Sequence, residues 1–178
     1  MAHSLFGGNN IVHTTPIPAG VPQEKAVAAL FHDHKFFIAC NPHQVDYKEK
    51  PTAEVELPEA VQALRTGEPT KIFTVTDRVH TLPAGIWDSD VISTYEFTNL
   101  KNGVFVRIKS PLSIVMDTTW EIRKSLAAEG DEEEEEAGLV ISEDMNLSCS
   151  MFLAPIVRSQ VENGWKGIHA KMCEKLKA

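Results

Sequence analysis

The sequence has few cysteines and no long apolar run. Its three cysteines, Cys40, Cys149 and Cys173, form no C-x-x-C pair, which argues against a disulfide framework and against a thiolate zinc site. No apolar stretch reaches the ~18 residues that a membrane-spanning helix needs. The first residues lack the basic region and the apolar core of a secretory signal peptide. These absences favour a reduced, cytoplasmic protein with no integral membrane association.

Basic charge is also scarce, with 17 Lys and Arg against 25 Asp and Glu and a formal net charge of −8. Residues 131–136 are six consecutive acids, and outside this run the charges nearly cancel. Such a chain lacks the basic surface that binds nucleic acid, so we expect no nucleic-acid partner. Like charges repel and keep a segment extended, so we expect a solvated acidic loop at 127–137.

The length and composition are typical of one globular domain. The chain has 178 residues, of which 43% are hydrophobic and 24% are charged, and these are ordinary values for a folded protein. We predict a flexible tail at 1–9 and a single domain over 10–178.

The N-terminal part predicts a strand, a helix and two short elements. The β-branched residues of 10–17 predict a strand that ends near Pro16. Apolar residues then recur at helical spacing and predict a helix over about 22–40, which the Asn-Pro pair at 41–42 ends. A short strand at 44–50 and a short helix at 59–65 follow.

The rest of the chain predicts an antiparallel meander and a long helix. Five segments show period-two patterns typical of strands: 71–80, 91–100, 103–108, 113–124 and 138–150. Short turns join several of them, at 82–85, at 110–111 and at 99–103, where Asn102 and Gly103 favour positive φ. At the end, Val157, Val161, Trp165, Ile168, Met172 and Leu176 recur at spacings of three and four. This pattern predicts a helix over 155–177, about 34 Å long at 1.5 Å per residue.

These elements predict an α+β fold in which a curved antiparallel sheet of about six to seven strands grips the long C-terminal helix. The chain resembles the START-like, helix-grip superfamily of polyketide cyclases and lipid-transfer proteins (SRPBCC). More narrowly, it resembles a poorly characterised group of filamentous-fungal proteins with that fold. The resemblance rests on segments 31–34 (FHDH), 76–78 (TDR) with 82–83 (LP), 100–103 (LKNG) and 142–144 (SED), and on Trp120.

The resemblance implies a cavity between the sheet and the C-terminal helix that holds a small hydrophobic metabolite. Some relatives of this kind act without a cofactor, so the resemblance implies a cofactor-free cyclase, isomerase or dehydratase (a lyase) of secondary metabolism. The alternative is a non-catalytic lipid or sterol binding and transfer protein. A third reading is a protein–protein module with a vestigial cavity.

Four residues are candidate acid–base or hydrogen-bonding groups. Glu143 alternates with apolar residues of 139–149, so it should face the core, where desolvation would suit a general acid or base. The alternatives are a bulge that turns Glu143 outward or a pairing with Arg. The orientation of the strand at 71–80 is open: if the face with Phe73, Val75 and Val79 points inward, Asp77 is a second buried carboxylate, with a structural Asp–Arg pair as the alternative. Tyr95 offers a hydroxyl donor, and His80 stands at the cavity rim.

Eight further residues are candidate ligand contacts: His34, Trp87, Met116, Trp120, Met145, Gly164, Trp165 and Ile168. For His34 and Trp120 we favour a place in the core over a ligand contact. Gly164 costs about 1 kcal/mol in a helix relative to Ala, which suggests close packing or room for a ligand. His32 and His34 point in different directions on a helix, so we predict no metal site.

Overall fold

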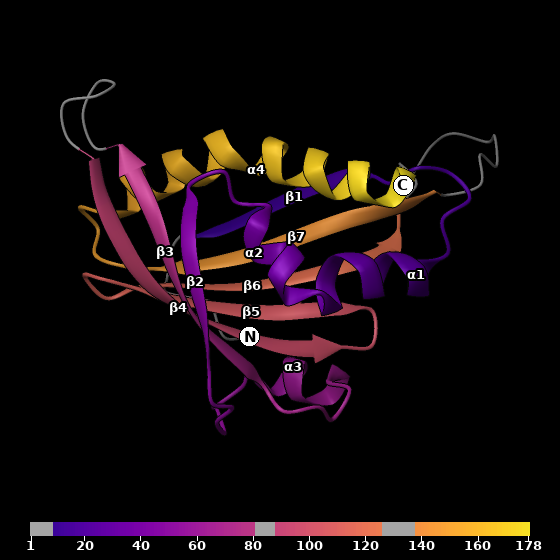
Figure 1. Ribbon diagram of the computed structural model, residues 1–178, viewed down its shortest axis with the longest axis horizontal. Coiled ribbons are helices and arrows are strands. Elements are labelled where there is room, and N and C mark those ends of the chain that lie inside the picture. The colour runs from indigo at the N-terminus through magenta and orange to yellow at the C-terminus, as the bar shows by residue number, and fades with distance from the viewer. Residues whose placement is uncertain (1–8, 81–87, 126–137) are drawn as a thin grey trace, which may run out of the picture.

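The computed structural model describes residues 9–80, 88–125 and 138–178. They form one seven-stranded antiparallel sheet with the strand order β1-β7-β6-β5-β4-β3-β2 (Figure 1). The strands are β1 (Asn10–Pro16), β2 (Gln44–Lys50), β3 (Lys71–His80), β4 (Asp88–Leu100), β5 (Gly103–Ser110), β6 (Ile114–Lys124) and β7 (Leu139–Ser148). All of the predicted strands are therefore present, and the antiparallel meander runs from β2 to β7.

The helices lie on both sides of the sheet. Helix α4 (Ala154–Lys177) and the segment with α1 (Gln23–Val27) and α2 (His34–Ala39) cover the concave face, whereas the short helix α3 (Glu59–Leu64) lies on the convex side (Figure 1). The α+β prediction, with a long C-terminal helix across a curved sheet, is confirmed. None of the described helices combines the length and the apolar character that crossing a membrane requires.

The predicted helix over 22–40 is interrupted. Between α1 and α2 the chain forms a π-helical turn, η1 (Ala28–His32), and then leaves helical geometry at Asp33, whose φ is −88° and ψ is 82°. The Asp33 carboxylate accepts a hydrogen bond from the Phe36 N–H at 3.0 Å and so caps the start of α2. An Asp side chain competes with the helix for backbone donors, and this is why one continuous helix was the wrong prediction.

The hairpin between β4 and β5 also differs from expectation. Leu100 pairs with Gly103 across a tight turn at 101–102, but neither Asn102 nor Gly103 has a positive φ. Positive φ occurs instead in the next hairpin, at Leu112 (63°) and Ser113 (58°). Gly103 is needed because it has no side chain. A Cβ at this position would overlap the carbonyl oxygen of Trp120 on the neighbouring strand β6.

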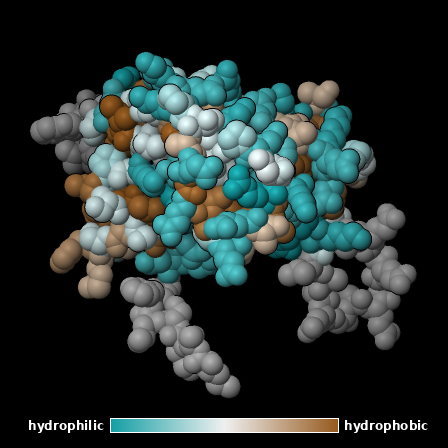
Figure 2. All heavy atoms as spheres, turned by 90° about the horizontal axis from the view of Figure 1, so that it is seen from below, coloured by the Kyte–Doolittle hydropathy of each residue, from teal (hydrophilic) through white to brown (hydrophobic). Residues whose placement is uncertain are grey.

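The core lies between the concave face and the helices above it. Its buried members include Leu30, Phe31, Phe37, Ile38, Phe73, Phe97, Trp120, Ile122, Ile141, Met172 and Leu176. A smaller apolar cluster, formed by Leu57, Val61, Leu100 and Phe105, fixes α3 to the convex face. The outer surface seen in Figure 2 is mostly hydrophilic, with apolar areas showing between the polar side chains.

Candidate functional site

Glu143 lies on the concave face of β7, as the alternation predicted. The residue is only 3% exposed. Its partner is His13 of β1, directly across the ladder, whose Nδ1 lies 3.0 Å from Glu143 Oε2. Among the described residues, Glu143 is therefore paired with a histidine and not with an arginine, and it is not turned outward by a bulge.

Helix α4 completes this buried cluster. His169 Nε2 lies 3.4 Å from Glu143 Oε2, and His169 Nδ1 lies 2.7 Å from the Thr15 hydroxyl. Glu162 reaches the other side of His13, with 3.2 Å between Glu162 Oε2 and His13 Nε2. We call these five residues (His13, Thr15, Glu143, Glu162 and His169) the histidine–glutamate cluster.

His13 lies between two carboxylates. Each of its ring nitrogens faces a carboxylate oxygen, and an ionised carboxylate can only accept hydrogen bonds. A ring nitrogen that carries a proton therefore donates to the glutamate that it faces. The Trp165 ring stacks on His13 with a centroid distance of 4.3 Å and an interplanar angle of 10°.

Sequence reasoning found Glu143 and Trp165 but missed the two histidines. Both histidines occupy positions that the sequence pattern marks as buried. His13 alternates with buried Ile11 on β1, and His169 lies four residues after Trp165 and three before Met172 on the apolar face of α4. No pattern in the sequence distinguishes Glu162 from other surface residues, since its side chain is 47% exposed. In the described part of the chain, no group of His, Cys, Asp and Glu has the arrangement of a metal site.

Asp77 and Tyr95 form a second polar pair on the concave face. The Tyr95 hydroxyl donates to Asp77 Oδ2 at 3.5 Å, and burial raises the pKa of both side chains above their ordinary values. The arginine next in sequence, Arg78, pairs with Asp90 on the other side of the strand. Tyr95 is therefore the partner of Asp77 in place of the predicted arginine.

The other predicted contacts are scattered. Met116, Trp120 and Met145 lie on the concave face, where Trp120 packs edge-on against Phe37 at 5.2 Å as a core residue. Ile168 packs against the core and Trp165 is half-buried. A Cβ at Gly164 would meet nothing within 4 Å, so close packing there is wrong, and room for a ligand stays a prediction. Trp87 lies outside the described residues, as does the side chain of His80.

His34 is a buried residue at the start of α2. It is 5% exposed, and its ring stacks on Phe97 with a centroid distance of 4.5 Å. Its Nε2 bonds Asn99 Oδ1 at 2.8 Å. Nearby, His32 Nε2 donates to the carbonyl oxygens of Leu100 and Gly103, each at 3.1 Å, so the two histidines make separate contacts.

The burial of His34 predicts a pH-dependent contribution to stability. Desolvation lowers the pKa of His34 in the folded protein, and the positive charge of Lys71 adds to this, whereas the unfolded chain keeps the ordinary value near 6.5. As the pH falls below that value the unfolded state takes up the proton first, so stability decreases by up to about 1.4 kcal/mol per pH unit. In urea denaturation at pH 7, 6 and 5, the stability advantage of wild type over His34→Gln should shrink with acidification. A difference that stays constant would contradict this assignment.

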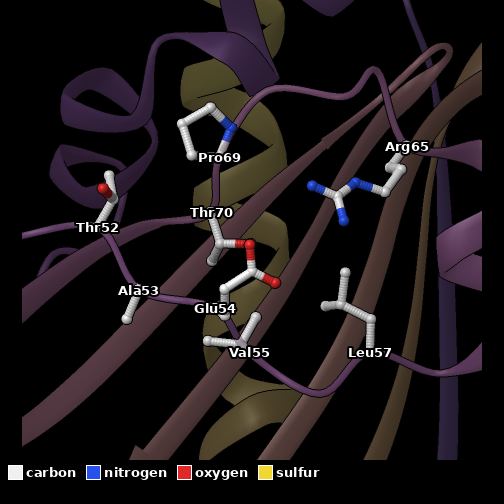
Figure 3. Close-up of a pocket in the computed structure, with 8 residues that line it drawn as sticks. All are labelled: Thr52, Ala53, Glu54, Val55, Leu57, Arg65, Pro69 and Thr70. Carbon is white, nitrogen blue, oxygen red and sulfur yellow. The ribbon is translucent and has the colours of Figure 1, made fainter.

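Pockets formed by described residues also lie outside the region beneath α4. One of about 280 Å³ lies on the convex face between α3 and β7, and one of about 180 Å³ lies beside segment 52–57. In the latter, the Arg65 side chain extends across the pocket toward Thr70 and Glu54 (Figure 3). The third, of about 400 Å³, is lined by His34 and lies between the η1–α2 segment and the β2–β3 edge of the sheet.

A family model matches the chain over residues 8–178, and its description is a domain of unknown function, DUF7053. The chain belongs to this family. No curated protein matches its sequence. Among solved structures it is similar to human STARD10, with a TM-score of 0.44 and 9% sequence identity over 94% of this chain and 62% of that chain.

The DUF7053 chain has the START-like, helix-grip arrangement that its sequence predicted. This follows from its own architecture, a seven-stranded antiparallel sheet with the C-terminal helix α4 across the concave face. The narrower resemblance to a filamentous-fungal group stays a prediction.

Proposed function

We propose that this DUF7053 chain binds a small, mostly apolar molecule between the concave face of the sheet and α4. The observation that carries the proposal is a set of buried polar atoms with no hydrogen-bond partner among the described residues: Asp77 Oδ1, Thr118 Oγ1 and His169 Nε2. The last of these lies 3.4 Å from Glu143 Oε2 but forms no hydrogen bond with it. Each such atom costs about 1–3 kcal/mol when it stays unpaired. Polar groups of a bound molecule would satisfy them.

The surroundings of these atoms are apolar and aromatic. Thr118 lies in register between Val106 and Met145, and the His169 ring lies 5.4 Å from Trp120 and 5.1 Å from Trp165. A suitable ligand therefore has a carbon skeleton that carries a few hydroxyl or carbonyl groups. Sterols, fatty acids and polyketides belong to this class.

Exposed apolar side chains at the start of α4 support this proposal. Met151 is 86% exposed, Phe152 is 89% exposed and Ile156 is 57% exposed. Large apolar side chains gathered at one place on a surface mark contact sites for apolar molecules. An apolar ligand would first meet the protein here.

Thr118→Val tests the proposal. The substitution removes the unpaired buried hydroxyl, so the ligand-free protein should gain about 1 kcal/mol of stability. The variant should also bind the probe 2-naphthol about fivefold more weakly than wild type does, since it loses one hydrogen bond, while its affinity for naphthalene stays unchanged. Fluorescence titration measures both affinities. Thr119→Val, on the opposite face of β6, is the matched control. Failure of wild type to bind either probe would overturn the proposal.

The histidine–glutamate cluster favours acid–base catalysis as a second candidate function. A carboxylate that lies 3.0 Å from an imidazole nitrogen, as Glu143 Oε2 does from His13 Nδ1, can pass a proton to and from that ring, which is what a cofactor-free cyclase, isomerase or dehydratase requires. Glu143 and His13 would hold the proton, and Tyr95 would donate a hydrogen bond.

An exchange assay separates this candidate from a non-catalytic lipid or sterol carrier. Wild type should accelerate the exchange of the α-protons of 2-tetralone with D₂O, followed by NMR. Glu143→Gln should lower this acceleration by about 10²–10⁴, the span of one acid–base group, while naphthalene binding persists. No acceleration by wild type would favour the carrier function.

A further inference from the structure

The pocket of about 280 Å³ between α3 and the convex face of the sheet has two unlike sides. Its apolar side combines Val61 and Leu64 of α3 with Val12 of β1. Val12 is 53% exposed and Leu64 is 43% exposed. Strands β6 and β7 form the polar side. A volume at the small end of the range for ligand pockets suits a small molecule with one apolar part and one polar part.

The charged residues that line this pocket leave one negative charge. They are Glu121, Arg123 and Asp144, two carboxylates against one guanidinium. Glu121 Oε1 lies 3.5 Å from Arg123 Nε, so these two charges oppose each other. Asp144 accepts a hydrogen bond from the neutral amide of Asn10 at 2.6 Å and forms no salt bridge with any described residue. The unopposed carboxylate favours a cation in the pocket.

Two further cations come close in sequence but do not pair with this carboxylate. Arg65 follows α3 directly and Lys101 follows β4 directly, and neither lines the pocket. The Arg65 side chain extends instead across the pocket beside segment 52–57 (Figure 3). The charge of Asp144 therefore remains available to a ligand.

A buried hydroxyl lies beside Asp144. Ser142 is on the same face of β7, two residues before Asp144, and is only 4% exposed. Its side chain lines the pocket and makes no hydrogen bond within the described part of the chain. A buried hydroxyl without a partner costs free energy, and its oxygen can accept a hydrogen bond. Ser142 and Asp144 therefore offer two neighbouring acceptors to a group with several N–H donors.

We propose that this pocket binds a small organic amine with an apolar body. Such an amine, like the lysine side chain, is an ammonium ion at pH 7. Its N–H groups donate to the Asp144 carboxylate and to the Ser142 hydroxyl, and its carbon skeleton lies against Val12 and Leu64. Val12 is directly opposite Asp144 in the ladder between β1 and β7, so the apolar side begins beside the carboxylate. The site is independent of the apolar ligand proposed beneath α4, on the other face of the sheet.

Three probes test the proposal by calorimetric titration. 2-Phenylethylamine carries both parts, 2-phenylethanol lacks the charge, and ethylamine lacks the apolar body. Wild type should bind 2-phenylethylamine about tenfold more tightly than 2-phenylethanol, the value of a charge-assisted hydrogen bond. It should also bind it at least about tenfold more tightly than ethylamine, because the ring buries apolar surface. Equal affinity for 2-phenylethylamine and either comparison probe would overturn the proposal, and so would a failure to bind 2-phenylethylamine.

Variants locate the binding site. Asp144→Asn should weaken 2-phenylethylamine binding about tenfold and leave 2-phenylethanol binding unchanged, and Ser142→Ala should weaken 2-phenylethylamine binding about fivefold. The matched control is Asp46→Asn, because Asp46 is an exposed carboxylate on β2, at the opposite edge of the sheet from β1. If Asp46→Asn weakens binding as much as Asp144→Asn does, binding is a general effect of the negative charge of the protein and the proposal is wrong.

NMR places the ligand without a substitution. In ¹H–¹⁵N spectra, 2-phenylethylamine should shift the amide resonances of 60–64 on α3 and of 142–144 on β7. Shifts confined to α4 would overturn the proposal. Thr118→Val should leave 2-phenylethylamine binding unchanged, and Asp144→Asn should leave 2-naphthol binding unchanged, so this site and the one beneath α4 can fail separately.

Discussion

Replacing Gly103 with alanine should cost about 3 kcal/mol or more of folding stability. A Cβ at this position would overlap the carbonyl oxygen of Trp120 and lie 2.8 Å from Glu121 Cα. Both atoms belong to the backbone of β6, and Gly103 itself pairs with Glu121 in the ladder. The clash therefore cannot be relieved by a side-chain rotation, and it must displace one strand from the other.

Urea denaturation followed by circular dichroism measures this loss. Gly164→Ala on α4 is the matched control, because a Cβ there meets nothing within 4 Å. That variant should gain up to about 1 kcal/mol, since alanine is the better helix former. If Gly103→Ala unfolds at the same urea concentration as wild type, β5 and β6 do not approach as closely as described.

Glu143→Ala should destabilise the fold by about 3–5 kcal/mol, the range for a buried ion pair that loses one partner. Glu143 is 3% exposed and faces His13, which is 8% exposed. Its removal leaves His13 with only the partly exposed Glu162 as a partner. It also takes away the carboxylate that lies 3.4 Å from His169 Nε2, so α4 loses a polar contact to the sheet.

Asp144→Ala is the matched control for this substitution. Asp144 is the next residue of β7 but points to the convex side, where it accepts a hydrogen bond from exposed Asn10 at 2.6 Å. Surface substitutions of this kind stay within about 0.5 kcal/mol. A loss below about 1 kcal/mol for Glu143→Ala in thermal or urea unfolding would mean that the cluster does not hold α4 to the sheet.

Local patterns in the sequence were enough to predict most of the secondary structure. Period-two alternation predicted β3 to β7 and placed Glu143 on the buried face, because neighbouring side chains of a strand point to opposite faces. The spacing of apolar residues predicted α4. Both signals depend only on residues that are close together in the chain.

The sequence was less informative where a side chain competes with the backbone. The apolar spacing over 27–38 predicted one helix, but the Asp33 carboxylate caps a new helix and turns the chain. Asn102 and Gly103 predicted a turn with positive φ, whereas the turn at 101–102 needs none. In both places the chosen geometry depends on contacts with β4, β5 and β6, which a local pattern does not contain.

The sequence by itself therefore determined the α+β class, the presence of the strands and of the C-terminal helix, and the burial of Glu143. Only the tertiary structure decided the partners of that carboxylate, since His13 and His169 lie 130 residues before it and 26 residues after it in the chain. It also decided that Asp77 faces Tyr95 and that His34 lines a pocket with Lys71. The physical reason is that hydrogen bonds and ion pairs need approach within a few ångströms, and the pairing of β1 with β7 and the docking of α4 produce that approach.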